Sequence, residues 1–478
     1  MCEKMIKSTL LTAVILMLLG SDATAQSSAL KIHPATDVYD GWKLGVQAWT
    51  FKKFTFYEAI EKTASLGLNW IEAYPGQKLN KEYPSVKVNP DMPPELRSEL
   101  KQKLKDSGIK LINFGVVELP NDEAKCRKVF DFAKDMGIET IVSEPPVGAF
   151  DLVEKLCKEY KIKVAIHNHP KPSFYWNPDK ILELCKGRSK LIGACTDTGH
   201  WVRSGLDPVE SLKKLEGRII SLHLKEIDDG HDIVWGTGKN RLEPILQELH
   251  RQNFKGVFSV EYEYNWENSV PEIRKSVQYF NKIAGSLKPT GWRDLLAEGL
   301  NGWILKPGTW TIDDGVLTLK GGGYIWTKET YGDFILDLDF MVSKGANSGV
   351  FFRTADIKKL VQTGIEVQIH ETNDENHYGM CGAIYNCMPP KKNMMKKAGL
   401  WNRMTLMAKA NKIYVVMNGE QIIDMNLDLW TTPHRNPDGT KNKFDTAYRD
   451  MPRNGHIGFQ DHGDSVWFRN IKIKPLKD

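Results

Sequence analysis

The stretch LIGACTDTGHW at 191–201 decides the fold, together with IISLHLKEI at 219–227. Each is a strand-like apolar run that ends in acidic, histidine or lysine side chains. KVAIHNHP at 163–170 and GVFSVEYEY at 256–264 repeat this pattern. Runs of this length and composition, bounded by polar ends, predict strands.

Helix-like runs separate these strands over residues 43–287. One example is YEAIEKTASLG at 57–67, where Gly67 suits a helix C-cap. Eight strand-like runs are each followed by a helix-like run, and strand starts recur roughly every thirty residues, as βαβ units require. The sequence therefore predicts an α/β fold, a (β/α)8 TIM barrel, over residues 40–286.

Ionisable side chains recur where the later strands end. In a parallel barrel these ends meet at one mouth, so groups remote in sequence share a pocket. Carboxylates and imidazoles that converge there suit one divalent ion, Mn²⁺, Mg²⁺, Co²⁺ or Zn²⁺. Such an ion chelates the carbonyl and hydroxyl oxygens of a sugar and stabilises an enediolate. The residues concerned are Glu144, His167, His169, Asp197, His200, His223, Lys225, Glu261 and Glu263.

The barrel half resembles the sugar phosphate isomerase/epimerase superfamily, which has a xylose-isomerase-like barrel. The resemblance rests on DTGH at 197–200, HLK at 223–225 and VEY at 260–262. It implies metal ligands at Asp197, His223 and Glu261. The family's fourth ligand is an acid on the fifth strand, but here that strand ends AIHNHP. Either Glu144, from the fourth strand, or His169 is expected to take its place.

Proton transfer needs further groups at the same mouth. The predicted acids or bases are His169, His200 and Lys225. The predicted substrate contacts are Glu263, which is also an available acid or base, and His167. Alternatively, one of His167 and His169 is a ligand and the other the substrate contact, or His167 packs deeper in the strand.

From Gly291 onward the helical period gives way to short alternating runs, such as FILDLDFMVS at 334–343. Turn signals, among them Asn418-Gly419, separate the runs. This pattern predicts an antiparallel β-sandwich over 291–476, with the domain boundary at 285–290. The stretch 431–454, rich in Pro, Asn, Asp, Arg and Lys, is expected to form a long surface loop.

A polar strand face is predicted in this second half. Glu366, Gln368 and His370 alternate with apolar residues and therefore share one side of a strand, while NSGVFFR ends in Arg353. Such a face suits a carbohydrate groove, with Glu366 and His370 as acid–base groups and Gln368 and Arg353 as substrate contacts. The alternative is an ordinary solvated sheet face.

The second half resembles the 3-keto-disaccharide hydrolase family, a concanavalin-like sandwich. The matching motifs occur in order and include GDFILDLDF, NSGVFFR, GIEVQI, GAIYN and FRNIKI. The resemblance implies recognition of glycosides that carry a ketone at C3. It also adds Tyr385 and His462 as substrate-binding positions.

The chain opens with lysines, an apolar stretch from Leu10 to Leu19 and then Ala23-Thr24-Ala25. This pattern predicts a cleaved secretory signal over residues 1–25, a periplasmic or secreted protein and no membrane span.

The net charge of +5 is small, and charges of both signs are interspersed along the chain, which argues against a nucleic-acid partner. Cys381 and Cys387 flank GAIYN and are expected either as a disulfide or as two buried thiols.

Both resemblances imply one chemistry. A ketone at C3 acidifies the C2 proton, and its removal followed by loss of the C1 substituent gives a 2-hydroxy-3-keto-glycal that water can hydrate. The sequence thus predicts a 3-keto-glycoside 1,2-lyase and glycal hydratase acting on a glycoside or keto-sugar. The alternatives are a metal-dependent sugar isomerase or epimerase with a carbohydrate-binding sandwich, and a non-catalytic glycan-binding protein.

Overall fold

The computed structural model describes residues 39, 41–238, 242–288, 291–371 and 377–476. The predicted secretory signal lies outside the described residues. Within them, no helix is both long and apolar enough to cross a bilayer.

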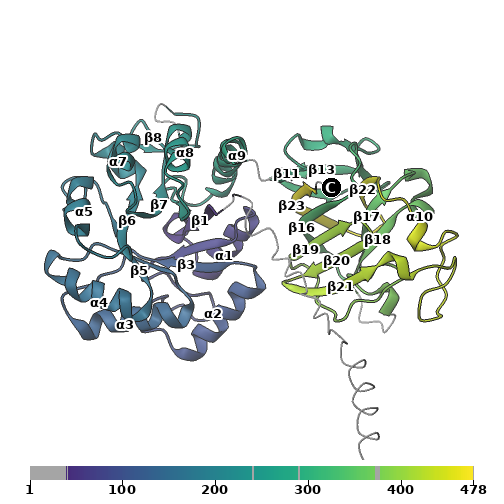
Figure 1. The fold of residues 1–478 in the computed structure, drawn as a ribbon, viewed down its shortest axis with the longest axis horizontal. Helices are drawn as coiled ribbons and strands as arrows, with labels where there is room; N and C mark the ends of the chain where they lie inside the picture. The colour runs from purple at the N-terminus through teal and green to yellow at the C-terminus, as the bar shows by residue number, and fades with distance from the viewer. Residues whose placement is uncertain (1–38, 40, 239–241, 289–290, 372–376, 477–478) are drawn as a thin grey trace, which may run out of the picture. The chain divides into compact units, whose positions relative to one another are not determined.

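The first half is a closed parallel barrel with the strand order β1-β10-β7-β6-β5-β4-β3-β2. This confirms the predicted TIM barrel. In Figure 1 helices surround the ring of strands. The strands are β1 (Lys43–Gln47), β2 (Trp70–Ala73), β3 (Lys110–Phe114), β4 (Thr140–Ser143), β5 (Lys163–His167), β6 (Ile192–Asp197), β7 (Ile219–Leu224) and β10 (Val257–Val260).

Local capping explains where several helices begin and end. At the start of the first helix, the Thr55 and Glu58 side chains bond each other's backbone N–H groups in a capping box. Gly67, one residue past the C-cap Leu66, takes the left-handed conformation with φ +72°. The helices are α1 (Phe56–Ser65), α2 (Pro94–Asp106), α3 (Glu123–Met136), α4 (Phe150–Tyr160), α5 (Pro178–Cys185), α6 (Thr198–Arg203), α7 (Pro208–Lys214), α8 (Leu242–Arg251) and α9 (Val270–Leu287).

A small hairpin follows β7, which the sequence analysis did not anticipate. It pairs β8 (Ile227–Asp228) with β9 (His231–Asp232). The buried Glu226 carboxylate anchors the following turn because it accepts the N–H groups of Gly236 and Gly238, at 2.7 and 2.8 Å. The hairpin brings Asp232 toward the carboxyl ends of the barrel strands, where it pairs with Arg203 of α6.

The second half consists of two antiparallel sheets, which confirms the predicted sandwich. One follows the order β13-β14-β23-β16-β19-β20-β21 and the other β12-β15-β22-β17-β18. The first comprises β13 (Trp310–Asp313), β14 (Val316–Leu319), β16 (Phe334–Val342), β19 (Asn402–Lys409), β20 (Lys412–Met417), β21 (Glu420–Asn426) and β23 (Val466–Pro475), with β11 (Arg293–Asp294) pairing β23. The second comprises β12 (Trp303–Ile304), β15 (Ile325–Thr327), β17 (Asn347–Thr354), β18 (Ile365–His370) and β22 (His456–Phe459).

The two halves bury their strands differently. Every residue of β6 is buried, because a barrel strand packs inward and against helices. In β18, Ile365, Val367 and Ile369 belong to the sandwich core, so the residues between them point to the other face of the sheet.

Cys381 and Cys387 are free, buried thiols, and burial raises the pKa of each to about 12.

Candidate functional site

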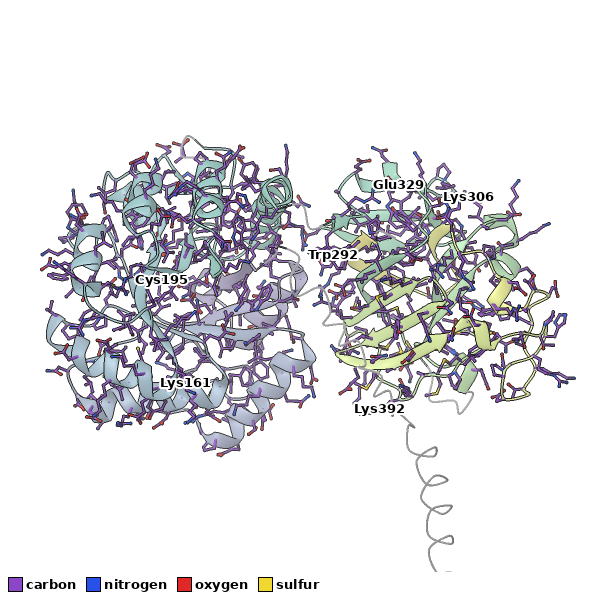
Figure 2. The ribbon with its side chains drawn as sticks, in the orientation of Figure 1. Lys161, Cys195, Trp292, Lys306, Glu329 and Lys392 are labelled. Atoms are coloured by element: carbon purple, nitrogen blue, oxygen red, sulfur yellow. The ribbon has the colours of Figure 1, made fainter. Side chains whose placement is uncertain are left out.

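Four ligand-type side chains meet at the carboxyl end of the barrel. They come from the ends of β5, β6 and β7 and from the residue after β10: His167, Asp197, His223 and Glu261. Their ligand atoms all lie within 4.8 Å of one another, and all four residues are buried. Cys195 marks this part of β6 in Figure 2, two residues before Asp197.

The atoms at this centre fit a cation. Asp197 Oδ2, His223 Nδ1 and Glu261 Oε2 are buried and make no hydrogen bond of good geometry, although His223 Nδ1 lies 3.0 Å from Glu261 Oε2 and Lys225 Nζ lies 3.2 Å from Asp197 Oδ2. Leaving three such atoms unsatisfied at one point is costly unless something binds them. Two carboxylate oxygens and two imidazole nitrogens are a donor set that suits Mn²⁺, Co²⁺ or Zn²⁺. The structure thus brings the predicted triad together as a candidate metal centre.

The fourth member differs from the expectation. Glu144 is grouped with His167 and His169 rather than with the triad. Its Oε1 lies 3.1 Å from His167 Nδ1 and 2.6 Å from His169 Nδ1. Glu144 therefore contacts His167 and His169, and His167 is the fourth member of the candidate centre.

His223 is held by a residue that the sequence analysis missed. Its Nε2 lies 2.9 Å from Oε1 of Glu72, which is buried on β2. Glu72 is itself fixed by Asn113 Nδ2 at 3.2 Å and Ser259 Oγ at 2.7 Å. This arrangement leaves Nδ1 of His223 facing the centre, as in carboxylate–histidine–metal sites. The signal was present in WIEAYPG at 70–76, where an acid interrupts a buried strand.

Lys225 balances the carboxylates of the centre. Its Nζ lies 3.2 Å from Asp197 Oδ2, 3.4 Å from Glu261 Oε2 and 2.7 Å from Glu263 Oε2. Burial alone would raise the pKa of Asp197, but Lys225 and His167 hold it well below its usual range. Burial likewise opposes ionisation of Lys225, yet the surrounding carboxylates raise its pKa. Both groups are charged at neutral pH.

His200 is held neutral beside the centre. Burial lowers its pKa to about 4, although Asp197 opposes the shift. Arg203 Nη1 lies 3.1 Å from His200 Nδ1, and because a guanidinium only donates, that nitrogen accepts. The proton of His200 is therefore on Nε2, which lies 3.5 Å from Asp197 Oδ2. Arg203 also pairs with Asp232 at 3.1 Å.

The other two predicted barrel groups differ in how free they are. His169 is half exposed, and its Nδ1 is bound to Glu144, so its Nε2 is available to a ligand. Glu263 is engaged by three donors instead, since Trp49 Nε1 lies 3.1 Å from its Oε1, and Lys225 Nζ and Arg203 Nη1 lie 2.7 and 3.3 Å from its Oε2. Glu263 is thus better suited to hold Lys225 than to accept a proton from substrate.

The sandwich presents the polar face that was predicted. In the register of β17 with β18, Glu366 pairs with Phe351, Gln368 with Gly349 and His370 with Asn347. Glu366 is 7% exposed, and burial raises its pKa to about 7 despite the opposing charge of Lys443. A Cβ at Gly349 would lie 2.2 Å from Glu366 Oε1, so the glycine makes room for this carboxyl. Gln368 Nε2 donates to Asn347 Oδ1 at 3.1 Å.

The structure contradicts the predicted substrate contact at Arg353. A register shift after Phe351 and a positive φ of +52° turn this side chain away from the Glu366 face. Its guanidinium is fully buried and donates to the carbonyls of Gly332 and Ala410 and to Asp333 Oδ1. Arg353 therefore ties strands together.

The two remaining predicted sandwich positions flank the face. Tyr385 donates its backbone N–H to the carbonyl of Glu366 at 3.0 Å, so it lies beside that residue. His462 is exposed in the turn between β22 and β23, two residues after Gln460, whose Nε2 lies 3.4 Å from Tyr324 Oη.

Comparisons with known proteins match the two halves separately. The xylose isomerase-like TIM barrel family matches residues 60–283. The 3-keto-alpha-glucoside-1,2-lyase-like domain family matches residues 291–474.

The individual relatives each cover only part of this chain. A 3-keto-disaccharide hydrolase of Bacteroides thetaiotaomicron is 26% identical over 36% of this chain and 71% of its own length. An inosose dehydratase of Clostridium perfringens is 26% identical over 52% of this chain and 96% of its own length. A protein of known crystal structure from Parabacteroides distasonis is 38% identical, covering 51% of this chain and 99% of that chain with a TM-score of 0.44.

Proposed function

We propose that the chain cleaves 3-keto-glycosides by 1,2-elimination and hydrates the resulting glycal. The chain joins a xylose isomerase-like TIM barrel to a 3-keto-disaccharide hydrolase domain and is a carbohydrate-active enzyme. The supporting observation is the buried cluster at the barrel mouth, where three polar atoms lack hydrogen bonds and converge on one point.

The cluster explains why a ketone next to a hydroxyl is the expected substrate. His167, Asp197, His223 and Glu261 would hold a divalent ion, which would supply Lewis-acid chemistry at this centre. Asp197 and Glu261 stay ionised at neutral pH because Lys225 and nearby histidines stabilise their charged forms. The two carboxylate ligands are therefore already ionised, whereas His167 and His223, whose pKa values are raised by neighbouring groups despite burial, would each release a proton on binding the ion.

His169 is the best placed base for the C2 proton. Glu144 fixes its Nδ1 at 2.6 Å, so the lone pair on Nε2 is free to accept. A carboxylate that orients a histidine and stabilises its cation is a recurring acid–base arrangement. Loss of the C2 proton leaves negative charge on the sugar oxygens.

Two donors at the same mouth suit that charge. His200 carries its proton on Nε2, and Lys225 is an ammonium buried among carboxylates. Donors that are already oriented stabilise developing charge without reorganisation. Departure of the C1 substituent then gives the glycal. Elimination of water, the reaction named for the inosose dehydratases, would follow the same order of proton removal and departure.

The experiment uses a 3-keto-glucoside deuterated at C2, the full chain and Mn²⁺. We expect aglycone release with either a slower rate or exchange of the label with solvent, since C2–H is broken. His169→Asn should lower kcat by about 10²–10⁴-fold, the usual contribution of a general base. His250→Asn, an exposed histidine on α8, is the matched control. Retention of the label in every product with an unchanged rate would exclude the elimination route.

We further propose that the chain is exported, since residues 1–25 have the pattern of a cleaved signal. An N-terminus at Gln26 in protein isolated from the producing cell is the expected result. A mature chain that retains Met1 would contradict it.

A further inference from the structure

The exposed large apolar side chains of the barrel half all lie at one end of it. Among the described residues 41–238 and 242–288 there are four of them, and each follows the carboxyl end of a barrel strand. Trp49 follows β1, Val147 follows β4, Phe174 follows β5 and Tyr264 follows β10. Single exposed apolar residues are ordinary, but their confinement to the face that carries the candidate metal centre indicates a binding surface.

Two of these residues belong to a larger group of rings, which we call the aromatic arc: Trp49, Tyr74, Tyr264 and Trp266. The arc follows β2, β1 and β10, which are neighbours in the barrel. The rings of Trp49 and Tyr74 meet edge to face at 5.0 Å. Lys52 Nζ lies 4.4 Å from the centre of the Trp49 ring and 3.6 Å from that of Trp266. Edge-to-face and cation–π contacts of this kind hold the rings in place.

Tyr264 is supported by the small hairpin that follows β7. The imidazole of His231 stacks on its ring, with the centres 4.4 Å apart and 14° between the planes. Tyr264 is nevertheless 46% exposed, so its exposed area lies away from His231. A ring that is supported on one face and exposed elsewhere is a platform for a second flat ring.

Hydrogen bonds join the aromatic arc to the candidate metal centre. Trp49 Nε1 lies 3.1 Å from Oε1 of Glu263, the residue before Tyr264. Glu263 Oε2 lies 2.7 Å from Lys225 Nζ, which in turn lies 3.2 Å from Asp197 Oδ2. The arc is thus continuous with the centre, and it suits the part of a substrate that extends from the reacting carbons into the mouth.

The chemistry of the arc favours an aryl group over a second sugar. A sugar at this place needs polar partners, whereas the indole N–H of Trp49 is already bound to Glu263. The half-buried Lys52 places a cation between two of the rings. When a C1–O bond breaks, its electron pair stays on the departing oxygen, and a phenol, with a pKa of about 10, carries that charge more readily than an alcohol.

We propose that the aromatic arc is a subsite for an aryl group at C1, so that the chain acts on aryl 3-keto-glycosides and releases a phenol. This inference rests on the proposed function. His169 accepts the C2 proton, and the C–H electrons pass through the enolate of the C3 ketone into the C1=C2 bond. The C1–O electron pair leaves with the aryl oxygen as a phenolate, which takes a proton from water.

The test compares phenyl and methyl 3-keto-glucosides with the full chain and Mn²⁺. Their intrinsic reactivities differ, but that difference is the same for every variant, so the ratio of the two kcat/KM values isolates contacts with the aryl group. We expect Tyr264→Ala to lower the phenyl to methyl ratio by about tenfold, the contribution of one aromatic contact. Tyr264→Phe, which keeps the ring, should retain the wild-type ratio.

Leu429→Ala is the matched control, because Leu429 is a 60% exposed apolar residue of the sandwich. A 3-keto-disaccharide, in which a second sugar is the C1 substituent, provides the other arm. An unchanged phenyl to methyl ratio in Tyr264→Ala would overturn the proposal. So would a loss confined to the disaccharide, because the aromatic arc would then hold a sugar.

A second measurement does not depend on turnover. Phenyl β-glucoside lacks the ketone, and saturation-transfer NMR reports which of its protons contact the protein. We expect the strongest saturation at the phenyl protons with the wild type and with Leu429→Ala, and a clear loss with Tyr264→Ala. Equal saturation with Tyr264→Ala and wild type would overturn the subsite. If the chain acts on none of the 3-keto-glycosides, the proposed function fails, and this measurement still tests the aryl contact.

Discussion

The barrel centre and the sandwich face handle buried charge in opposite ways. In the barrel, Asp197 and Glu261 are surrounded by Lys225 and histidines at 3.0–3.8 Å. On the sandwich, Glu366 is buried without an ion pair among the described residues. The difference separates two uses of a carboxyl. A ligand must stay ionised, whereas a proton carrier must change state near the working pH.

The pKa shifts follow this division. Lys225 and His223 outweigh burial and lower the pKa of Glu261 to about 2. Burial dominates at Glu366 and raises its pKa to about 7. The same residue type is therefore held ionised in one half and shifted toward neutral pH in the other.

The strongest test of the barrel side is His223→Ala. This change removes one of four ligands, so we expect loss of most bound Mn²⁺ and of the barrel's catalytic step. Metal content after dialysis, measured by mass spectrometry, gives the answer, and His250→Ala is the matched control. Full metal occupancy in His223→Ala would contradict the distinction between the barrel centre and the sandwich face. The barrel residues would then form an ion-pair network rather than a metal site.

A milder change addresses the residue behind the ligand. Glu72→Gln keeps the size of the side chain but removes the charge that orients His223. Such outer partners typically contribute about 10–100-fold to metal affinity. We expect a loss of that size in titrations with Mn²⁺, and none in Glu61→Gln on the exposed face of α1. Equal affinity in wild type and Glu72→Gln would mean that packing alone orients the histidine.

Much of this molecule was predictable from its strand ends. Apolar runs that stop at Asp197, His223 and Glu261 predicted both the barrel and the triad, because closure of a parallel sheet leaves one place for those ends to meet. Alternation in β18 predicted that Glu366, Gln368 and His370 share a face, because the side-chain period of a strand is two.

What escaped prediction depends on geometry that periodicity does not encode. Whether Glu144 or His167 lies with the triad depends on the side-chain positions at the ends of the neighbouring strands β4 and β5. Arg353 does not lie on its expected face because the register of β17 with β22 is irregular, and nothing in NSGVFFR predicts that irregularity. Lys443 lies in a loop without a repeating pattern, so only tertiary contacts bring it near Tyr385.

The smallest expected effect concerns stability, and it tests the sandwich side. The pKa of Glu366 is raised in the folded chain from an ordinary value near 4.5 to about 7, so the folded state holds a proton that the unfolded state has lost. The contribution of Glu366 to folding stability is fully present below pH 4.5 and is lost as the pH rises through 7, by on the order of 3 kcal/mol at most.

Paired carboxylates such as Asp197 change the folding stability in the opposite direction with pH, so the pH dependence must be compared between variants. In Glu366→Gln the urea midpoint should fall less between pH 5 and pH 8 than in the wild type, while Glu420→Gln follows the wild type. Parallel curves for Glu366→Gln and wild type would place the Glu366 pKa at its ordinary value and remove the distinction between the two halves.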